Sequence, residues 1–375
     1  MRALDKELLS KNIDEIAEYD LENNKLFGSC YAVVQNDETV YKNCFGFADM
    51  DKKPINGRTI FRLASMTKPI TAIATLILVN RGLLSLDDQV SAFIPGYKNV
   101  RITKVENNKL VDLGESKNPV TIRHLLTHSS GIGSDSDKSV FLCAEDKKTA
   151  MNLAKFYAKV GLDFEPGTSQ YYSGVGSFAV LGYIIEKIIG RNLEEFYRQE
   201  IFEPCDMTDT TFIPTEEQWS RVIEMHGKNE NGNTAVEMEK GCAFIDYPCE
   251  HCVAGAGLFS TLDDYVKFGK MLLNKGKTAK KIIVKEEIFN EMISPQVEID
   301  STTYWGFGVR VIKGEHPFLP KGSYGWSGAY GSHFWVNPAD GVVAVFMKNS
   351  TVDGGAANES SRNFESAVNR AFVNI

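Results

Sequence analysis

Ser65 and Lys68 are the two side chains whose types and spacing most clearly suggest chemistry. They lie three residues apart at the start of an apolar segment, residues 65–80, that has the pattern of a helix. Residues i and i+3 share one face of a helix, so the lysine amine can reach the serine hydroxyl. A serine needs an adjacent base to become a nucleophile, and a lysine with a lowered pKa can serve. The spacing predicts a nucleophilic serine; a chance match on a solvated helix face is the alternative.

A second candidate segment, residues 164–174, contains two adjacent tyrosines after a Pro-Gly turn signal. One of the two phenols could hydrogen-bond to the nucleophile and carry its proton to the leaving group. A neighbouring cationic lysine would favour this role, because it stabilises the phenolate. The alternative interpretation is a loop that begins a helix and buries its tyrosines.

The third candidate segment, residues 324–335, reads YGWSGAYGSHFW. Small residues at the start of a strand allow a substrate to approach the backbone closely. Backbone N–H groups there could stabilise a tetrahedral oxyanion together with the N–H of the nucleophile. Taken alone, the segment is equally consistent with a bulged edge strand.

The elements that must position these segments follow an α+β pattern. Helical periodicity dominates from about residue 64 to 280, and strands are predicted at both ends of the chain, at 28–35, 39–47, 304–312, 332–336 and 342–348. We therefore expect one unit of 375 residues, with 1–60 and 295–375 forming an antiparallel sheet lobe flanked by the terminal helices. Residues 61–294 form an inserted, mainly helical lobe, with Ser65 at the junction. Polar insertions at 107–118, 133–138 and 228–234 are predicted to be surface loops.

Composition excludes several classes of function. The chain is 43% hydrophobic and 24% charged, carries a net charge of −8 and has no block of basic residues, so nucleic acid is not an expected partner. The longest apolar stretch, residues 70–79, is too short to span a bilayer. The N-terminus lacks the apolar core of a signal peptide, so a cytoplasmic protein is expected, with a trimmed secreted form as the alternative. No P-loop, dinucleotide fingerprint or HExxH motif implies a cofactor.

The seven cysteines are an odd number spread over a long chain, which argues against a disulfide framework. Cys249 and Cys252 flank Glu250-His251 with a spacing typical of metal or redox sites. A zinc site needs about four ligands, and no second pair with suitable spacing accompanies them. Reduced thiols in a loop, with no metal, are therefore expected.

Together the three segments resemble the serine β-lactamase and penicillin-binding-protein superfamily, in its class C-like branch, closest to the family VIII carboxylesterases. Residues 121–131, 206–212 and 254–261 match further stretches of that branch in the same order. The resemblance implies a β-lactamase/transpeptidase-like fold and chemistry through an acyl-enzyme. It makes Ser65 the nucleophile and Lys68 its base partner. Tyr172 matches the first position of the branch's Tyr-x-Asn motif.

Trp326-Ser327-Gly328 lies where that branch carries Lys-Thr-Gly or His-Thr-Gly, which implies the Ala329 N–H as the second oxyanion donor beside that of Ser65. Two positions depart from the pattern. Gly174 replaces the Asn that binds a substrate amide, and Trp326 replaces the Lys or His that helps to hold a substrate carboxylate. The loss of both polar anchors favours small, uncharged carboxylic esters as substrates.

Three alternatives are weighed against a carboxylesterase. A β-lactamase or a D-Ala-D-Ala carboxypeptidase or D-aminopeptidase keeps the same machinery. A non-catalytic acyl-binding or sensing module is disfavoured, because Ser65, Lys68 and Tyr172 are all retained. A Ser-His-Asp hydrolase is disfavoured too, because no Gly-x-Ser-x-Gly elbow occurs, and His128 and His333 are more simply explained as helix-turn and strand residues.

Overall fold

The computed structural model describes residues 2–23, 25–133, 136–143, 146, 149–230, 232–235, 247–353 and 357–373. Its centre is an eight-stranded antiparallel sheet in the order β10-β11-β12-β13-β14-β15-β2-β3. These strands span β10 Val297–Glu298, β11 Thr303–Trp305, β12 Arg310–Ile312, β13 Tyr324–Ser327, β14 His333–Asn337, β15 Val342–Lys348, β2 Gly28–Gln35 and β3 Glu38–Gly46. Among the described residues, the sheet therefore takes its strands only from the two ends of the chain, as the sequence predicts.

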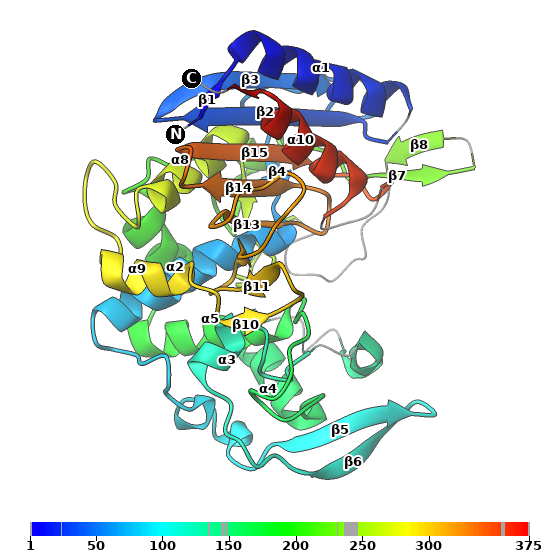
Figure 1. Ribbon diagram of the computed structural model, residues 1–375. Helices are drawn as coiled ribbons and strands as arrows, with labels where there is room; N and C mark the ends of the chain where they lie inside the picture. Colours follow the sequence, from blue (N-terminus) through cyan, green and yellow to red (C-terminus); the bar gives the residue numbers. More distant parts are fainter. Residues whose placement is uncertain are drawn as a thin grey trace.

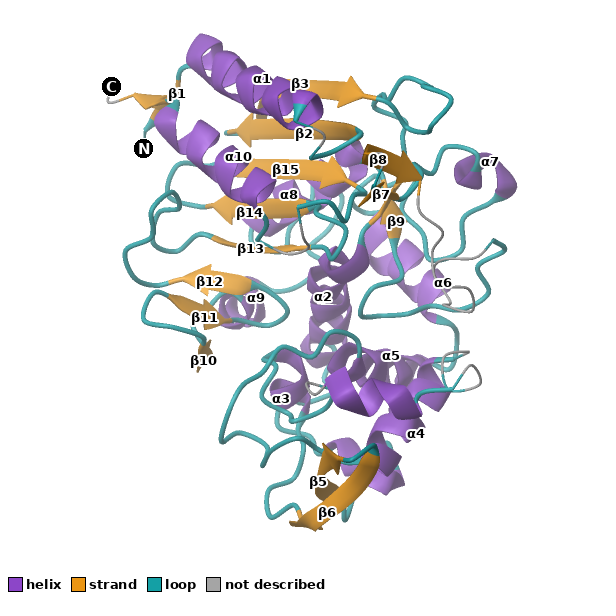
Figure 2. Cartoon of the chain, turned by 90° about the vertical axis from the view of Figure 1, so that its right-hand side faces the viewer, coloured by secondary structure: helices purple, strands orange, loops and turns teal. Residues whose placement is uncertain are grey.

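Strands from the two ends of the chain meet where β15 pairs with β2. This antiparallel pairing runs from Val342 opposite Gln35 to Lys348 opposite Ser29. Every residue of both strands is buried. A strand buried on both faces needs a layer on each side of the sheet. Figure 2 shows α1 and α10 side by side over one face and α8 behind the other.

The outer layer consists of α1 Lys6–Glu22 and α10 Glu359–Arg370, which pack against each other. Their N-caps are Asp5 and Asn358, whose side chains accept backbone N–H groups of the first turn. One hydrophobic core lies between the sheet and this outer layer. Another lies on the opposite, inner face of the sheet, where α8 Leu262–Leu273 packs on β14 and β15. Helix α2 Thr67–Asn80 lies between the sheet and the helices further down the molecule (Figures 1 and 2).

The remaining elements lie mainly between β3 and β10 along the chain. The helices are α3 Ile122–Leu126, α4 Ala150–Val160, α5 Gly176–Ile189, α6 Leu193–Tyr197, α7 Glu216–Trp219 and α9 Glu286–Met292. The two-stranded pairs are β1 Ala3–Leu4 with β16 Phe372–Val373, β4 Phe61–Arg62 with β9 Phe259–Ser260, β5 Arg101–Glu106 with β6 Lys109–Glu115, and β7 His226–Asn229 with β8 Gly232–Ala235. No helix in these described ranges is both long and apolar enough to cross a membrane.

Several local predictions are wrong. Residues 304–312 are not one strand, because the chain turns through Gly306 and Gly308 and forms the antiparallel pair β11 and β12. The polar segment 107–118 is mostly the hairpin of β5 and β6, and the described residues of 228–234 lie mostly in strands β7 and β8. Both segments are rich in polar residues, a composition that is also typical of surface loops. The loop predicted at 133–138 falls partly outside the described residues, and residues from 136 begin a 3-10 turn.

The disulfide prediction is corrected at one pair. Cys30 and Cys44 stand directly opposite each other on β2 and β3 and are joined by a disulfide, with their Cα atoms 4.1 Å apart. This pairing depends on the register of the hairpin, which a cysteine count does not reveal. Cys249 and Cys252 are buried thiols outside any disulfide, as predicted.

Candidate active site

Ser65 lies in a short 3-10 turn, Ala64–Met66, that leads directly into α2. The pairing of β4 with β9 fixes the chain just before it. Ala64 has a φ of +45°, in the left-handed region that non-glycine residues rarely occupy. Such backbone strain concentrates at functional sites. The turn presents Ser65 at the end of the helix with only 8% of its surface exposed.

Lys68 is completely buried and its amine contacts Ser65, as the spacing predicts. Nζ donates to Ser65 Oγ at 3.1 Å, to the carbonyl of Gly255 at 2.8 Å and to the carbonyl of Gly174 at 2.5 Å. An ammonium has three donors, so these three acceptors satisfy it fully. Burial lowers the pKa of Lys68 below its ordinary value, although neighbouring Tyr172 opposes the shift. A lowered pKa increases the fraction of neutral amine, the form that can accept a proton.

Tyr172 lies on the other side of the same amine. Lys68 Nζ is 5.0 Å from the centroid of the tyrosine ring. The phenol oxygen accepts a hydrogen bond of 3.3 Å from Trp326 Nε1. Tyr172 precedes α5, whose first residues follow the Gly174 carbonyl that binds Lys68. The structure therefore brings Ser65, Lys68 and Tyr172 together around one amine.

Gly174 supplies a carbonyl and leaves open space. A Cβ placed on Gly174 would meet none of the described atoms within 4 Å beyond its chain neighbours. The resemblance places an Asn at this position in lactamases, so the side-chain volume that would bind an amide is vacant here.

The third segment reaches the nucleophile through Gly328. A Cβ on Gly328 would lie 2.4 Å from the Leu63 carbonyl, so only glycine lets the end of β13 approach the turn that carries Ser65. Ala329 follows in the turn between β13 and β14 and is exposed. Trp326 faces Tyr172, with ring centroids 5.2 Å apart. Ser327 points to the opposite face of the strand, where its hydroxyl bonds to His333.

Trp305 and His128 complete the site, and the sequence did not predict either of them there. Trp305 stacks on Tyr172 at 5.8 Å and meets Trp326 edge-on at 4.8 Å. Its Nε1 donates to Gln170 Oε1 at 2.9 Å. Trp305 ends a short strand that was predicted to continue, and no motif marks it. Only its aromatic character next to Gly306 could have indicated it.

His128 lies beneath Tyr172, with ring centroids 4.7 Å apart. Its Nδ1 accepts the N–H of Ser173 at 3.1 Å, and among the described residues no hydrogen bond joins it to Ser65. Burial, reinforced by the charge of Lys68, lowers the pKa of His128 well below the usual value. The ring is therefore neutral, and it holds the tyrosine loop instead of acting as a triad base.

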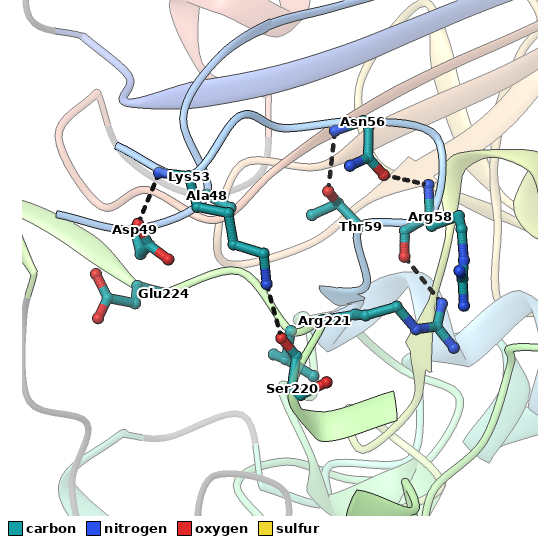
Figure 3. Close-up of a pocket in the computed structure, with 10 residues that line it drawn as sticks. Ala48, Asp49, Lys53, Asn56, Arg58, Thr59, Ser220, Arg221 and Glu224 are labelled. Atoms are coloured by element: carbon teal, nitrogen blue, oxygen red, sulfur yellow. Dashed lines mark hydrogen bonds between the residues drawn. The ribbon is translucent and has the colours of Figure 1, made fainter. Parts of the chain in front are cut away.

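Of the cavities in the described part of the chain, one lies away from the three segments and another shares residues 167–170 with the second segment. One, of about 320 Å³, is formed by residues 48–59 and 220–224 and is lined by charged side chains such as Lys53, Arg58 and Glu224 (Figure 3). The other, of about 490 Å³, is lined by residues of α3, β10 and the loop 167–170. It borders the site through Gln170, the partner of Trp305. Within the described ranges, no group of three or more His, Cys, Asp or Glu is placed to hold a metal ion.

Comparison with known proteins gives a matching family, similar relatives and similar structures. The family model described as Beta-lactamase matches residues 13–367. Esterase EstB of Burkholderia gladioli is 27% identical over 389 residues, covering 94% of this chain and 93% of the esterase. Acyltransferase calJ of Penicillium decumbens is 29% identical over 335 residues, covering 78% and 76%. The structure of EstCE1, described as a hydrolase with promiscuous acyltransferase activity, superposes with a TM-score of 0.83 at 21% identity, covering 97% of this chain and 99% of that one.

Proposed function

The chain belongs to the beta-lactamase family, and from this premise we propose that it is a serine hydrolase that forms an acyl-enzyme on Ser65 and hydrolyses small, uncharged carboxylic esters. The observation that carries the proposal is the contact of 3.1 Å between Lys68 Nζ and Ser65 Oγ, made by an amine whose pKa is lowered by burial. Relatives named as an esterase and an acyltransferase support a serine hydrolase or acyltransferase in general, and the ester assignment goes one step further.

In the proposed acylation step, the neutral amine of Lys68 takes the hydroxyl proton of Ser65 while Ser65 Oγ attacks the ester carbonyl. The bond to the alcohol breaks, and the departing oxygen receives a proton through the phenol of Tyr172. Water then attacks the acyl-enzyme in the same way and releases the carboxylic acid. The backbone N–H groups of Ser65 and Ala329 are the proposed donors to the oxyanion in both steps.

The preference for uncharged esters rests on Gly174 and Trp326. The open space at Gly174 offers no amide to a substrate, and Trp326 offers no positive charge to a carboxylate. Instead Trp326, Trp305 and Tyr172 form an aromatic wall beside Lys68. An alkyl or aryl group of an ester can pack on such a wall, and discrimination there is weak, about 1–3 kcal/mol per methylene.

Two measurements test this proposal. Intact mass after mixing with p-nitrophenyl butyrate should show an acyl adduct in the wild type and none in Ser65→Ala. Ser323→Ala is the matched control, because it removes the hydroxyl of another buried serine, one that has no hydrogen-bond partner among the described residues. If Ser65→Ala hydrolysed the ester at the wild-type rate, Ser65 could not be the nucleophile. A higher kcat/KM for the cephalosporin nitrocefin than for p-nitrophenyl butyrate would replace the esterase with a β-lactamase.

A further inference from the structure

A row of buried polar side chains crosses from β13 to α10, on the face of the sheet opposite Trp326. Ser327 Oγ lies 2.7 Å from His333 Nδ1, and His333 Nε2 lies 3.0 Å from Glu365 Oε1. Arg310 of β12 donates to the same carboxylate oxygen at 3.2 Å. Ser327, His333 and Glu365 are 3%, 2% and 4% exposed. The catalytic steps proposed above use none of these side chains.

The direction of the hydrogen bonds follows from Glu365. Burial alone would raise the pKa of this carboxyl, but the bond from His333 and the charge of Arg310 more than offset it, so its pKa is lowered. The other titratable group facing it is His316. An ionised carboxylate only accepts, so His333 Nε2 carries a hydrogen. In the neutral ring Nδ1 is then an acceptor, and the Ser327 hydroxyl donates to it.

This row stands at the base of the turn that carries Ala329. Ser327 and His333 are directly paired across β13 and β14, and residues 328–332 form the turn between them. Inside the turn, Gly328 N donates to the Ser332 carbonyl at 2.8 Å, and Gly331 N donates to the Gly328 carbonyl at 3.0 Å. The side-chain hydrogen bond between Ser327 and His333 therefore joins the two strand ends from which the turn begins and ends.

We propose that His333 and Glu365 are positioning residues, which hold Ser327 and thereby aim the Ala329 N–H at the oxyanion; this rests on the oxyanion role proposed above for Ala329. Glu365 fixes the tautomer of His333, and His333 fixes the hydroxyl of Ser327, the last residue before the turn. The position of an oxyanion donor matters mainly in the transition state, so these residues act on kcat more than on KM.

The size of the effect has an upper bound. Removing an oxyanion donor completely costs about 10²–10³ in kcat. Loss of the hydrogen bond between Ser327 and His333 only displaces the Ala329 N–H. We therefore expect kcat to fall by about 10-fold, with KM within about twofold of the wild type. Ser327 and His333 act through the same bond, so their effects must overlap.

The test compares kcat and KM for p-nitrophenyl butyrate in Ser327→Ala, His333→Leu and the double variant, with Ser323→Ala, a buried serine just before β13, as the control. Each single variant is expected to lose about 10-fold in kcat, and the double variant no more than either. His333→Asn, whose Oδ1 can take the place of Nδ1 as an acceptor, should retain more activity than His333→Leu. The ¹⁵N spectrum of histidine-labelled wild-type protein should show His333 protonated at Nε2.

A kcat within twofold of wild type in folded Ser327→Ala, or a multiplicative loss in the double variant, would overturn the proposal. A His333 ring protonated at Nδ1 in the wild-type spectrum would do so without any variant. Failure here is distinct from failure of the proposed function, because all these variants keep Ser65 and must still show the acyl adduct by intact mass. If the wild type itself forms no adduct, the proposed function fails first.

Discussion

At the scale of single residues, the site is organised around the amine of Lys68. Its three acceptors come from three separate parts of the chain, Ser65, Gly174 and Gly255, so one buried amine connects the nucleophile, the tyrosine loop and the segment before β9. A buried amine costs free energy unless each of its donors is satisfied. The same group is therefore both a structural tie and the base in the proposed chemistry.

The roles proposed for Lys68 and Tyr172 predict large losses of rate. Lys68→Ala and Tyr172→Phe should each lower kcat by about 10²–10⁴, because each removes a group that moves a proton in the transition state. Tyr171→Phe is the matched control, because this neighbouring tyrosine is 63% exposed. Steady-state hydrolysis of p-nitrophenyl butyrate measures all three. Equal losses in Tyr172→Phe and Tyr171→Phe would remove Tyr172 from the mechanism.

The lowered pKa of Lys68 predicts the pH dependence of acylation. Only the neutral amine accepts the Ser65 proton, so the rate should rise with pH along a limb whose midpoint lies below the ordinary lysine value. Stopped-flow measurement of the p-nitrophenol burst gives this rate directly. Lys68→Arg keeps the positive charge at all these pH values, so it should be slow and its rate should show no such limb. A limb that survives in Lys68→Arg would assign the titration to another group.

The sequence predicted which side chains meet where the contact follows from local spacing, as it does for Ser65 and Lys68 on one helix face. Tyr172 was identified by its place in the Tyr-x-Asn motif of the resembling family, and its role stays a prediction. Trp305, His128 and the partners of Ser327 belong to segments far apart in the sequence, and their meeting depends on sheet register and helix packing. The sequence explains His333 simply as a strand residue and not as a partner of Ser327, because a sequence does not show which face of a strand a histidine occupies.

At the scale of elements, the turn between β11 and β12 supports the start of α2. Gly308 has a φ of +67°, and a Cβ there would lie 3.0 Å from the Lys68 carbonyl and 3.1 Å from the Cβ of Ala72. Only glycine combines this conformation with so close an approach. The sequence predicts one continuous strand over residues 304–312, and the turn is visible only from the packing against α2.

Gly308→Ala should therefore lower the free energy of unfolding by about 1–3 kcal/mol, through the strain of a positive φ and the contact with α2. Gly322→Ala is the matched control, because Gly322 has a φ of +86° and no described atom within 4 Å of its Cβ position. It carries the conformational strain alone and should cost only about 1 kcal/mol. Urea unfolding of both variants measures the difference. If Gly322→Ala is as damaging as Gly308→Ala, the close approach to α2 contributes nothing.

At the scale of the whole molecule, the pattern of strands at both ends and helices between them was enough to predict one sheet built from distant parts of the chain. The finer division into a sheet lobe of 1–60 and 295–375 and a helical lobe of 61–294 stays a prediction. Helix α8, which lies within 61–294, covers the inner face of the sheet. A pattern of periodicities gives the type of each element but not which element covers which face.

The disulfide between Cys30 and Cys44 predicts a dependence of stability on redox state. It closes a loop of 14 residues, which restricts the unfolded chain and stabilises the fold by about 2–3 kcal/mol. Dithiothreitol should therefore lower the midpoint of urea unfolding in the wild type. The Cys30→Ala/Cys44→Ala double variant should show the lower midpoint with or without the reductant. An unchanged wild-type midpoint, with reduction verified by thiol titration, would contradict this.

The pairing of β2 with β15 also sets the order in which the protein can be completed during synthesis. Gln35 leaves the ribosome about 300 residues before its partner Val342, a delay of about 15–60 s at ordinary elongation rates. Throughout that interval the nascent hairpin of β2 and β3 has an apolar, unpaired edge, the kind of surface that chaperones protect and that aggregates when left exposed. The turn bearing Ala329 emerges in the same late portion. A prematurely terminated chain thus contains Ser65, Lys68 and Tyr172 but cannot assemble the site around them.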